Sequence, residues 1–286
     1  MEFASLDDLR ARARLLPPGP CCLLICEDAV EVASSLAHHL AAGFHSVVLA
    51  LAPGVPLEPP PDERVHPLRL ARRAATLTED CVNALIDGAA PGQWLAYAHN
   101  AEYLFHPFAE TRRVGEALAF CAEERRDALL TYVVDLYAGG PPAETGGVDC
   151  DDAWLDATGY FALARDGVDG PKERQLDFYG GLRWRFEEHV PLSRRRIDRV
   201  ALFRARPGLS LRPDHLLSVE EMNTYACPWH NSMTAAIASF RAAKALATNP
   251  ESRHDIDRFR WDGSVRFEWR AQQLMDLGLM EPGQWF

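Results

Sequence analysis

The stretch CCLLICEDAVEVASSLAHHLAAGFHSVVLAL, residues 21–51, decides the fold of this chain. Its two apolar runs, 21–26 and 45–51, are typical of buried parallel strands, because such strands are covered on both faces. Between them, residues 27–42 carry apolar side chains at helical spacing, and Gly43 provides a natural helix end. This strand–helix–strand order predicts two parallel strands joined by a crossover helix.

The same alternation continues as far as residue 137. A strand expected at 65–70 should lie on an edge of the sheet, because Pro67 has no N–H for a central ladder. The further elements that we expect up to this point are helices at 76–88 and 110–127 and strands at 93–98 and 129–137. The sequence therefore predicts an α/β fold with a mostly parallel sheet flanked by helices.

Beyond residue 137 the pattern loosens. Residues 138–190 look rich in loops, one or two short strands are expected within 198–211, and Ser232–Ala247 is expected to form an alanine-rich helix. The length fits one large α/β domain. We expect a single domain over residues 1–286, made of a half at 21–137, a second half at 138–247 and a tail at 248–286.

Composition excludes several classes of protein. The net charge of −11 argues against nucleic acid as the main partner, because that binding relies on Lys and Arg neutralising phosphates. The seven cysteines form no CxxC pair, which favours reduced, buried thiols in a cytoplasmic protein. Neither a secretory signal nor a transmembrane segment is expected, since Gly, Pro and His interrupt the uncharged stretch 32–57.

Four short blocks of sequence occur in a specific order along the chain. They are ICE at 25–27 with LAHH at 36–39 and GF at 43–44; WLAYAHNAEYL at 94–104; WLDATGY at 154–160 with GGLRWRF at 180–186; and His215 with WH at 229–230 before the helix expected from Ser232. Together these blocks resemble the family 2 glycosyltransferases, in the bacterial subgroup related to family 92. The resemblance covers about residues 21–245.

The resemblance implies a GT-A fold, with a Rossmann-like sheet and a loop-rich acceptor half. It also implies transfer of a sugar from a nucleotide-sugar donor to a polysaccharide or cell-surface glycan acceptor. In the family, a DxD motif at a strand end binds Mg²⁺ or Mn²⁺, which neutralises the diphosphate leaving group. Here His99 and Ala101 stand at the two acid positions, and only Glu102 remains acidic.

The donor site is therefore degenerate, and the resemblance leaves two alternatives for it. A metal ion could be bound by His99, Glu102 and His230, since imidazole suits Mn²⁺ or Zn²⁺ better than Mg²⁺. Alternatively, the protein is metal-independent. Glu27 matches the acid of the family's opening Asn-Glu pair, whose Asn position is Cys26, and is expected to contribute to donor binding.

Four further side chains are candidates for the chemistry. Asp135 ends a buried apolar strand and Asp156 lies in the third block, so either could be the base that activates an acceptor hydroxyl, unless each only caps a turn or loop. Arg183 and Arg185 follow two glycines and could clamp a diphosphate together with His230. The competing interpretation is that these arginines form a surface ion-pair network with Glu187 and Glu188, and that His230 caps the helix expected after it.

Three functions remain open at this level. The first is a glycosyltransferase-like enzyme, and the second is a non-catalytic relative that binds a sugar, a nucleotide or a partner protein. The third, a zinc or manganese hydrolase, is disfavoured because the ten histidines show no HExxH spacing. The aromatic residues Trp269, Trp285 and Phe286 could pack on the core or on a second subunit, so a homodimer is a further possibility.

Overall fold

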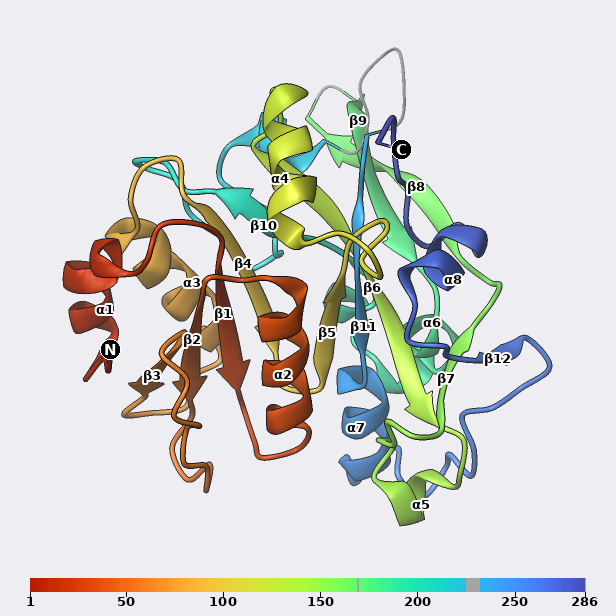
Figure 1. The fold of residues 1–286 in the computed structure, drawn as a ribbon. Helices are drawn as coiled ribbons and strands as arrows, with labels where there is room; N and C mark the ends of the chain where they lie inside the picture. Colours follow the sequence, from red (N-terminus) through yellow and green to blue (C-terminus); the bar gives the residue numbers. More distant parts are fainter. Residues whose placement is uncertain (169, 225–231, 286) are drawn as a thin grey trace. The chain divides into compact units, whose positions relative to one another are not determined.

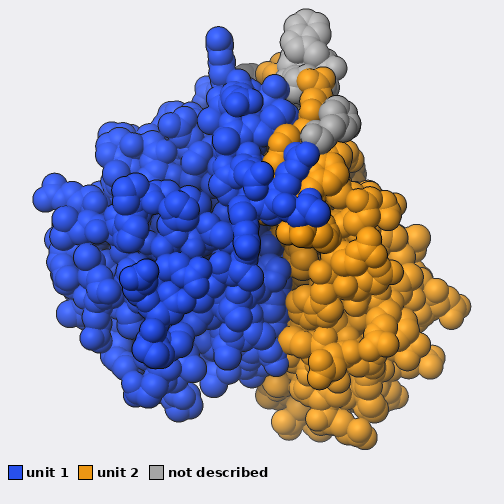
Figure 2. Space-filling model, viewed as in Figure 1, with its two compact units in different colours: residues 1–104, 111–130, 200–223 blue, residues 105–110, 131–199, 224–286 orange. Residues whose placement is uncertain are grey.

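A computed structural model describes residues 1–168, 170–224 and 232–285 of the chain. The chain divides into two compact units that interleave along the sequence, shown in two colours in Figure 2. Unit 1 comprises residues 1–104, 111–130 and 200–223, and unit 2 comprises residues 105–110, 131–199 and 224–286. These boundaries differ from the division into 21–137, 138–247 and 248–286, because the chain returns to unit 1 after residue 199.

Unit 1 contains a parallel sheet (Figure 1). Its strands lie in the order β3-β2-β1-β4, and the antiparallel strand β10 pairs with β4. The bounds are β1 Cys21–Cys26, β2 Ser46–Leu51, β3 Val65–Arg69, β4 Trp94–His99 and β10 Asp198–Arg204, with β5 at Glu102–Phe105. β3 lies at the end of this order and contains Pro67, so the expected edge strand is confirmed.

Helices cover both faces of the sheet in unit 1. The bounds are α1 Leu6–Arg12, α2 Val32–Ala42, α3 Leu77–Gly88 and α4 Val114–Glu123. The chain crosses from β1 to β2 in one direction and from β3 to β4 in the other, so right-handed crossovers place α2 and α3 on opposite faces (Figure 1). Helix α2 ends at Gly43, whose φ of 99° is accessible to glycine without strain. The expected mostly parallel α/β sheet with flanking helices is thus confirmed.

Unit 2 contains the longer strand β6, Ala128–Ala138, which begins in unit 1. β6 pairs in parallel with β11 and antiparallel with β7, and β12 lies antiparallel to β7. The bounds are β7 Ala153–Asp156, β11 Ala235–Ser239 and β12 Ser264–Arg266, with a separate hairpin made by β8 Phe161–Gly167 and β9 Gly170–Tyr179. Its helices are α5 Pro142–Thr145, α6 Leu182–Arg185, α7 Arg241–Thr248 and α8 Ala271–Asp276.

Two expectations for this part of the chain are wrong. The helix expected over Ser232–Ala247 is instead strand β11 followed by the shorter helix α7. All five residues of β11 are buried and pair with β6, and this burial outweighs the helix propensity of alanine. The region 138–190 is also more regular than expected, because it contains the β8–β9 hairpin.

A hydrophobic cluster holds α6 and α7 in place within unit 2. It consists of Tyr137, Leu182, Ala243, Leu246, Ile256 and Phe259, all buried. Because Leu182 begins α6, this packing fixes the short helix that carries both candidate arginines. No helix in the described part of the chain is long and apolar enough to cross a lipid bilayer.

Candidate functional site

The register of β6 and β7 brings the two candidate aspartates together in unit 2. Leu136 on β6 pairs with Leu155 on β7, so one further step along this register places Asp135 opposite Asp156. Side chains directly opposite each other in an antiparallel pair lie on one face, with Cβ atoms about 5 Å apart. Both aspartates are 1% exposed. Two carboxylates therefore face each other in a buried position, which requires compensating positive charge.

Helix α6 supplies that charge to Asp135 through Arg183. The Nε atom of Arg183 lies 3.2 Å from Asp135 Oδ1, and the backbone N–H of Arg183 donates to Oδ2 at 3.3 Å. Burial raises the pKa of Asp135, and the neighbouring Arg183 guanidinium opposes this shift. Among the residues that the structure describes, none donates a well-aligned hydrogen bond to Oδ1. Oδ1 of Asp135 thus interacts with the Arg183 guanidinium by charge, without a well-aligned hydrogen bond.

A glycine permits the close approach of α6 to Asp135. Gly181, at the start of the helix, has φ 65°, and a Cβ atom built there would lie 3.0 Å from Asp135 Oδ2. A larger side chain would meet both backbone strain and a carboxylate oxygen at this position. The glycine of the sequence motif thus leaves room for the Asp135 side chain of the protein itself.

Asp156 differs from Asp135 because donors surround it. Oδ2 accepts a hydrogen bond from Arg185 Nε at 2.7 Å, whereas Oδ1 accepts from the Tyr137 hydroxyl at 2.6 Å and from Trp261 Nε1 at 2.8 Å. Arg185 also donates to the carbonyl oxygen of Phe259 at 2.6 Å. Asp156 therefore ties β6, β7, α6 and the 259–261 segment together, and its oxygens are already occupied.

Tyr160 adds a second polar atom that lacks a partner. Burial raises the pKa of its hydroxyl well above the usual value, and the carboxylates of Asp156 and Asp135 act in the same direction. Within the described ranges the hydroxyl has no hydrogen-bond partner. Its ring lies against Gly180, where a Cβ atom would come within 2.2 Å. Two polar atoms of the cluster thus lack a well-aligned hydrogen bond within the described residues: the Tyr160 hydroxyl, and Asp135 Oδ1, which lies 3.2 Å from Arg183 Nε.

The candidate arginines form ion pairs with these two aspartates and not with Glu187 or Glu188. Glu187 instead pairs with Arg195 at 2.7 Å. The expected network with the two glutamates therefore does not form, because the turn of α6 directs both arginines toward β6 and β7. Arg183 and Arg185 remain slightly exposed, at 17% and 18% of their side chains. Each guanidinium is already charge-neutralised, so a diphosphate would have to compete with a buried carboxylate.

In unit 1, His99 and Glu102 bind each other. Glu102 Oε2 accepts from the backbone N–H of His99 at 2.8 Å and lies 3.2 Å from His99 Nδ1. The other ring nitrogen, Nε2, lies 3.0 Å from the Thr78 hydroxyl at the start of α3. Ala101, in the turn between them, adopts a left-handed conformation with φ 60°. Both ionisable side chains are fully buried.

The expected metal site combines this pair with His230, which lies outside the described residues. Within residues 1–168, 170–224 and 232–285, no group of three or more His, Cys, Asp or Glu side chains is arranged to hold a metal ion. The chemistry of the pair is that of an imidazole hydrogen-bonded to a carboxylate and a hydroxyl. A metal at this position stays a prediction.

The loop after β1 is fastened to the loop after β4. The Asn100 side chain donates to Asp28 Oδ1 at 2.6 Å and to the Val30 carbonyl at 2.8 Å, and it accepts from the backbone N–H of Glu27 at 3.0 Å. Glu27 is half-buried at this edge of the parallel sheet, where ligands bind in doubly wound folds. Asn100 was not singled out from the sequence, although it lies in the block at 94–104 and directly follows strand β4.

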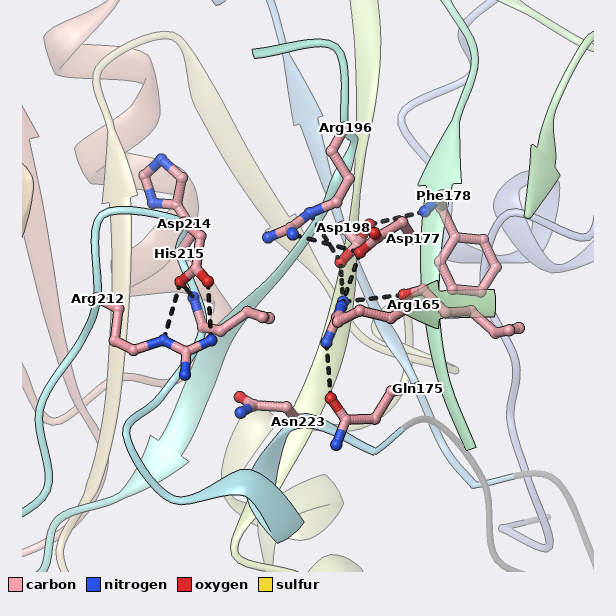
Figure 3. Close-up of polar contacts among 12 residues, drawn as sticks. Arg165, Gln175, Asp177, Phe178, Arg196, Asp198, Arg212, Asp214, His215 and Asn223 are labelled. Carbon is pink, nitrogen blue, oxygen red and sulfur yellow. Dashed lines mark hydrogen bonds and ion pairs between the residues drawn. The ribbon is translucent and has the colours of Figure 1, made fainter. Parts of the chain in front are cut away.

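A second acid–arginine network in unit 2 escaped the sequence analysis (Figure 3). Arg165 binds Asp177 Oδ1 at 2.8 Å and Asp198 Oδ2 at 3.0 Å, and Arg196 contacts both aspartates at 3.3 and 3.2 Å. Burial raises the pKa of Asp198 to about 6, against the opposing influence of Arg196. The network fixes the β8–β9 hairpin to the start of β10. Its members are up to 33 residues apart, so no local pattern could have revealed it.

Comparisons with known proteins identify no family for this chain. No family model matches the chain, and no curated protein matches it. One solved structure found in the search is the crystal structure of HddC from Yersinia pseudotuberculosis. The match covers 85% of this chain and 84% of that one, at 8% identity and a TM-score of 0.29, a likeness too weak to assign a fold or an activity.

Proposed function

We propose that the protein is a glycosyltransferase-like enzyme that transfers a sugar from a nucleotide-sugar donor to a polysaccharide or cell-surface glycan acceptor. The observation that carries the proposal is the convergence of Asp135, Asp156, Arg183 and Arg185 in unit 2. All four were selected from the sequence, and they come from three separate segments of the chain. The Tyr160 hydroxyl and Asp135 Oδ1 lack a well-aligned hydrogen bond within the described residues, which supports a role for these polar atoms beyond holding the fold.

In this proposal Asp135 is the base. A raised pKa makes a carboxylate a better proton acceptor near neutral pH, which general-base catalysis requires. The acceptor hydroxyl would donate its proton to Asp135 Oδ1 while its oxygen attacks the anomeric carbon. The bond from that carbon to the donor diphosphate breaks, and the nucleoside diphosphate leaves. Asp156 acts as a positioning residue, because its oxygens already bind Arg185, Tyr137 and Trp261.

The donor could be bound with Mn²⁺ or Mg²⁺, or it could be bound without a metal. The proposal favours binding without a metal. Glu102, the acid that remains at the family's metal-binding position, accepts hydrogen bonds from His99. We further propose a cytoplasmic location, which six free cysteines in the described part of the chain support. A homodimer through the C-terminal aromatic residues stays a prediction; Trp285 packs against Phe108, 5.8 Å between ring centroids.

The test is turnover of UDP- and GDP-sugars by the purified protein, with and without Mn²⁺, alongside thermal shift. A ligand at about 100 times its Kd should raise the free energy of unfolding by about 2.7 kcal/mol. Asp135→Asn should lower donor turnover by about 100-fold or more while preserving donor binding. The matched control is Glu268→Gln, which alters an exposed pair with Arg270. Unchanged turnover in the Asp135 variant would overturn its role as base.

The second candidate is a non-catalytic protein of the same fold that binds a sugar, a nucleotide or a partner protein. The ion pairs of the two arginines favour it, because Arg183 and Arg185 are each neutralised by a buried aspartate and not held ready for a diphosphate. Full burial of His99 and Glu102 favours it as well. A thermal shift with a nucleotide sugar, combined with no turnover at any metal concentration, would select this function. Turnover above the Asp135→Asn background would select the transferase.

A further inference from the structure

Thr78, His99 and Glu102 in unit 1 form a hydroxyl–imidazole–carboxylate series. The Thr78 hydroxyl lies 3.0 Å from His99 Nε2, and His99 Nδ1 lies 3.2 Å from Glu102 Oε2. This is the arrangement by which an imidazole activates a hydroxyl nucleophile while a third group orients the imidazole. The three residues come from the start of α3, the end of β4 and the start of β5.

The carboxylate determines which imidazole nitrogen carries the proton. Glu102 Oε2 already accepts a hydrogen bond from the His99 backbone N–H, so the same oxygen is placed to accept another from His99 Nδ1. His99 Nε2 is then the acceptor, and the Thr78 hydroxyl is the donor. The backbone N–H of His99 also donates to the same Glu102 oxygen, which fixes the carboxylate against the strand end. The series is therefore oriented for proton transfer from Thr78 to His99.

The position of Thr78 supplies a second requirement of nucleophilic catalysis. Thr78 is the second residue of the twelve-residue helix α3, and it is half-buried, whereas His99 is fully buried behind it. The first N–H groups of a helix have no acceptor within the helix, so those of Thr78 and Glu79 can stabilise a negative oxygen. The helix start thus supplies N–H donors for an oxyanion in the same turn as the hydroxyl, a turn that also carries the carboxylates of Glu79 and Asp80.

We propose that Thr78 is a nucleophile for acyl transfer from small carboxylic esters, with His99 as its general base and Glu102 as a positioning residue. The Thr78 oxygen forms a bond to the ester carbonyl carbon while its proton passes to His99 Nε2. The tetrahedral intermediate collapses by breaking the bond to the leaving alcohol, which takes the proton from His99. Water then cleaves the acyl-threonine with His99 as base, which releases a carboxylic acid and restores the hydroxyl. This activity is independent of the glycosyl transfer proposed for unit 2.

The experiment uses p-nitrophenyl acetate and the full-length protein. Release of p-nitrophenol is measured by absorbance, and the site of acetylation in a rapidly quenched sample is located by peptide mass spectrometry. The proposal predicts an acetyl group on Thr78 and a fall in rate of about 100-fold in Thr78→Val, which replaces the hydroxyl with a methyl group of similar size. Thr78→Ser retains the hydroxyl and should restore both the rate and the adduct.

A matched control lies two residues away on the same helix start. Thr76 also carries a bonded hydroxyl, which donates to Asp80 at 2.9 Å, so Thr76→Val alters a comparable hydrogen bond away from His99. It should leave the rate within about twofold of the wild-type value, in contrast to the fall of about 100-fold expected when the nucleophilic Thr78 hydroxyl is lost. Equal rates for the two valine variants, or acetylation at another residue such as the half-buried Cys150, would overturn the proposal. Thermal melting of each variant identifies any that fails to fold. If Thr78→Val does not fold, Thr78→Ser decides the outcome: an acetyl group on Ser at position 78 supports the proposal, and its absence overturns it.

Discussion

The His99–Glu102 pair of unit 1 and the acid–arginine cluster of unit 2 are both buried, but they are built from different parts of the chain. His99 and Glu102 are three residues apart, on either side of one left-handed turn. In the cluster, Asp135 and Asp156 meet arginines that lie 48 and 29 residues further along the chain. The first arrangement depends on one local conformation, and the second on the correct pairing of distant elements.

The two regions also differ in how they compensate charge. Glu102 binds a backbone N–H and an imidazole, both of which donate without a permanent charge. Asp156 binds a guanidinium that is itself largely buried, so loss of either partner leaves the other charge without compensation. Breaking such a pair costs more than weakening the hydrogen bonds of a carboxylate whose donors carry no permanent charge. The comparison therefore predicts unequal sensitivity to substitution.

The largest expected effect comes from Asp156→Asn in unit 2. The amide retains the shape but removes the charge that Arg185 requires, so the free energy of unfolding should fall by about 3 kcal/mol. Urea denaturation measures this loss. The control Glu268→Gln, in an exposed pair, should change it by less than about 0.5 kcal/mol. Equal losses in the two variants would show that the cluster adds nothing beyond a surface ion pair.

The next effect is a pH dependence of the free energy of unfolding, which arises from Asp198 in the second acid–arginine network of unit 2. Burial raises its pKa to about 6 from 3.8. The folded protein therefore binds the proton more tightly than the unfolded chain. The resulting stabilisation is complete below about pH 4 and is lost as the pH rises through 6, a change of about 3 kcal/mol.

Asp198→Asn removes this titration. We therefore expect the stability of the wild-type protein relative to the variant to fall by about 3 kcal/mol between pH 4 and pH 7.5. Urea denaturation of both proteins at several pH values provides the measurement, and titrations common to both cancel. A relative stability that rises with pH would mean that Arg165 and Arg196 dominate over burial.

A smaller loss is expected for Glu102→Gln in unit 1. The amide oxygen can still accept from the His99 backbone N–H and ring, so the cost should be about 2 kcal/mol. The measurement is again the free energy of unfolding, compared directly with that of Asp156→Asn. If Glu102→Gln destabilises the protein more than Asp156→Asn does, the contrast between the two regions fails.

The smallest effect isolates the contact between α6 and Asp135. Gly181→Ala and Gly54→Ala both place a Cβ at a positive φ, but only the first also approaches a neighbour within 4 Å, namely Asp135. Backbone strain should cost each variant about 1 to 2 kcal/mol, with Gly181→Ala at the upper end because its φ of 65° and ψ of −155° are essentially restricted to glycine. The Gly181 variant should lose about 1 kcal/mol more through overpacking. Thermal unfolding of the two variants gives the difference, and identical melting points would contradict the close approach.

Much of unit 1 could be predicted from the sequence, because its pattern is local. The apolar run of β1 and the helical spacing before Gly43 each lie within a short window, and Pro67 identifies the edge strand without reference to any other element. Unit 2 was harder to predict. Residues 235–239 are rich in alanine, and their conformation depends on pairing with β6, which lies about 100 residues earlier.

The candidate site, too, was predictable in part: its residues could be chosen from the sequence, but their partners could not. The residue types and positions of Asp135, Asp156, Arg183 and Arg185 were chosen from the sequence, and the structure brings all four together in one cluster. Which acid would meet which arginine could not be predicted, because the nearest acids in sequence, Glu187 and Glu188, are not their partners. Thr78 and Asn100 were missed: Thr78 lies in no motif, Asn100 lies in the block at 94–104 but was not chosen from it, and each gains its partners only through the fold.

The sequence alone determined the alternation of strands and helices in residues 21–137, since periodicity, proline and glycine act over a few residues. Only the tertiary structure decided that the arginines of α6 turn inward to two buried carboxylates and that Thr78 meets His99. Ion pairs and hydrogen bonds depend on distances of about 3 Å between groups far apart in the chain. Such distances exist only after the strands have paired and the helices have packed.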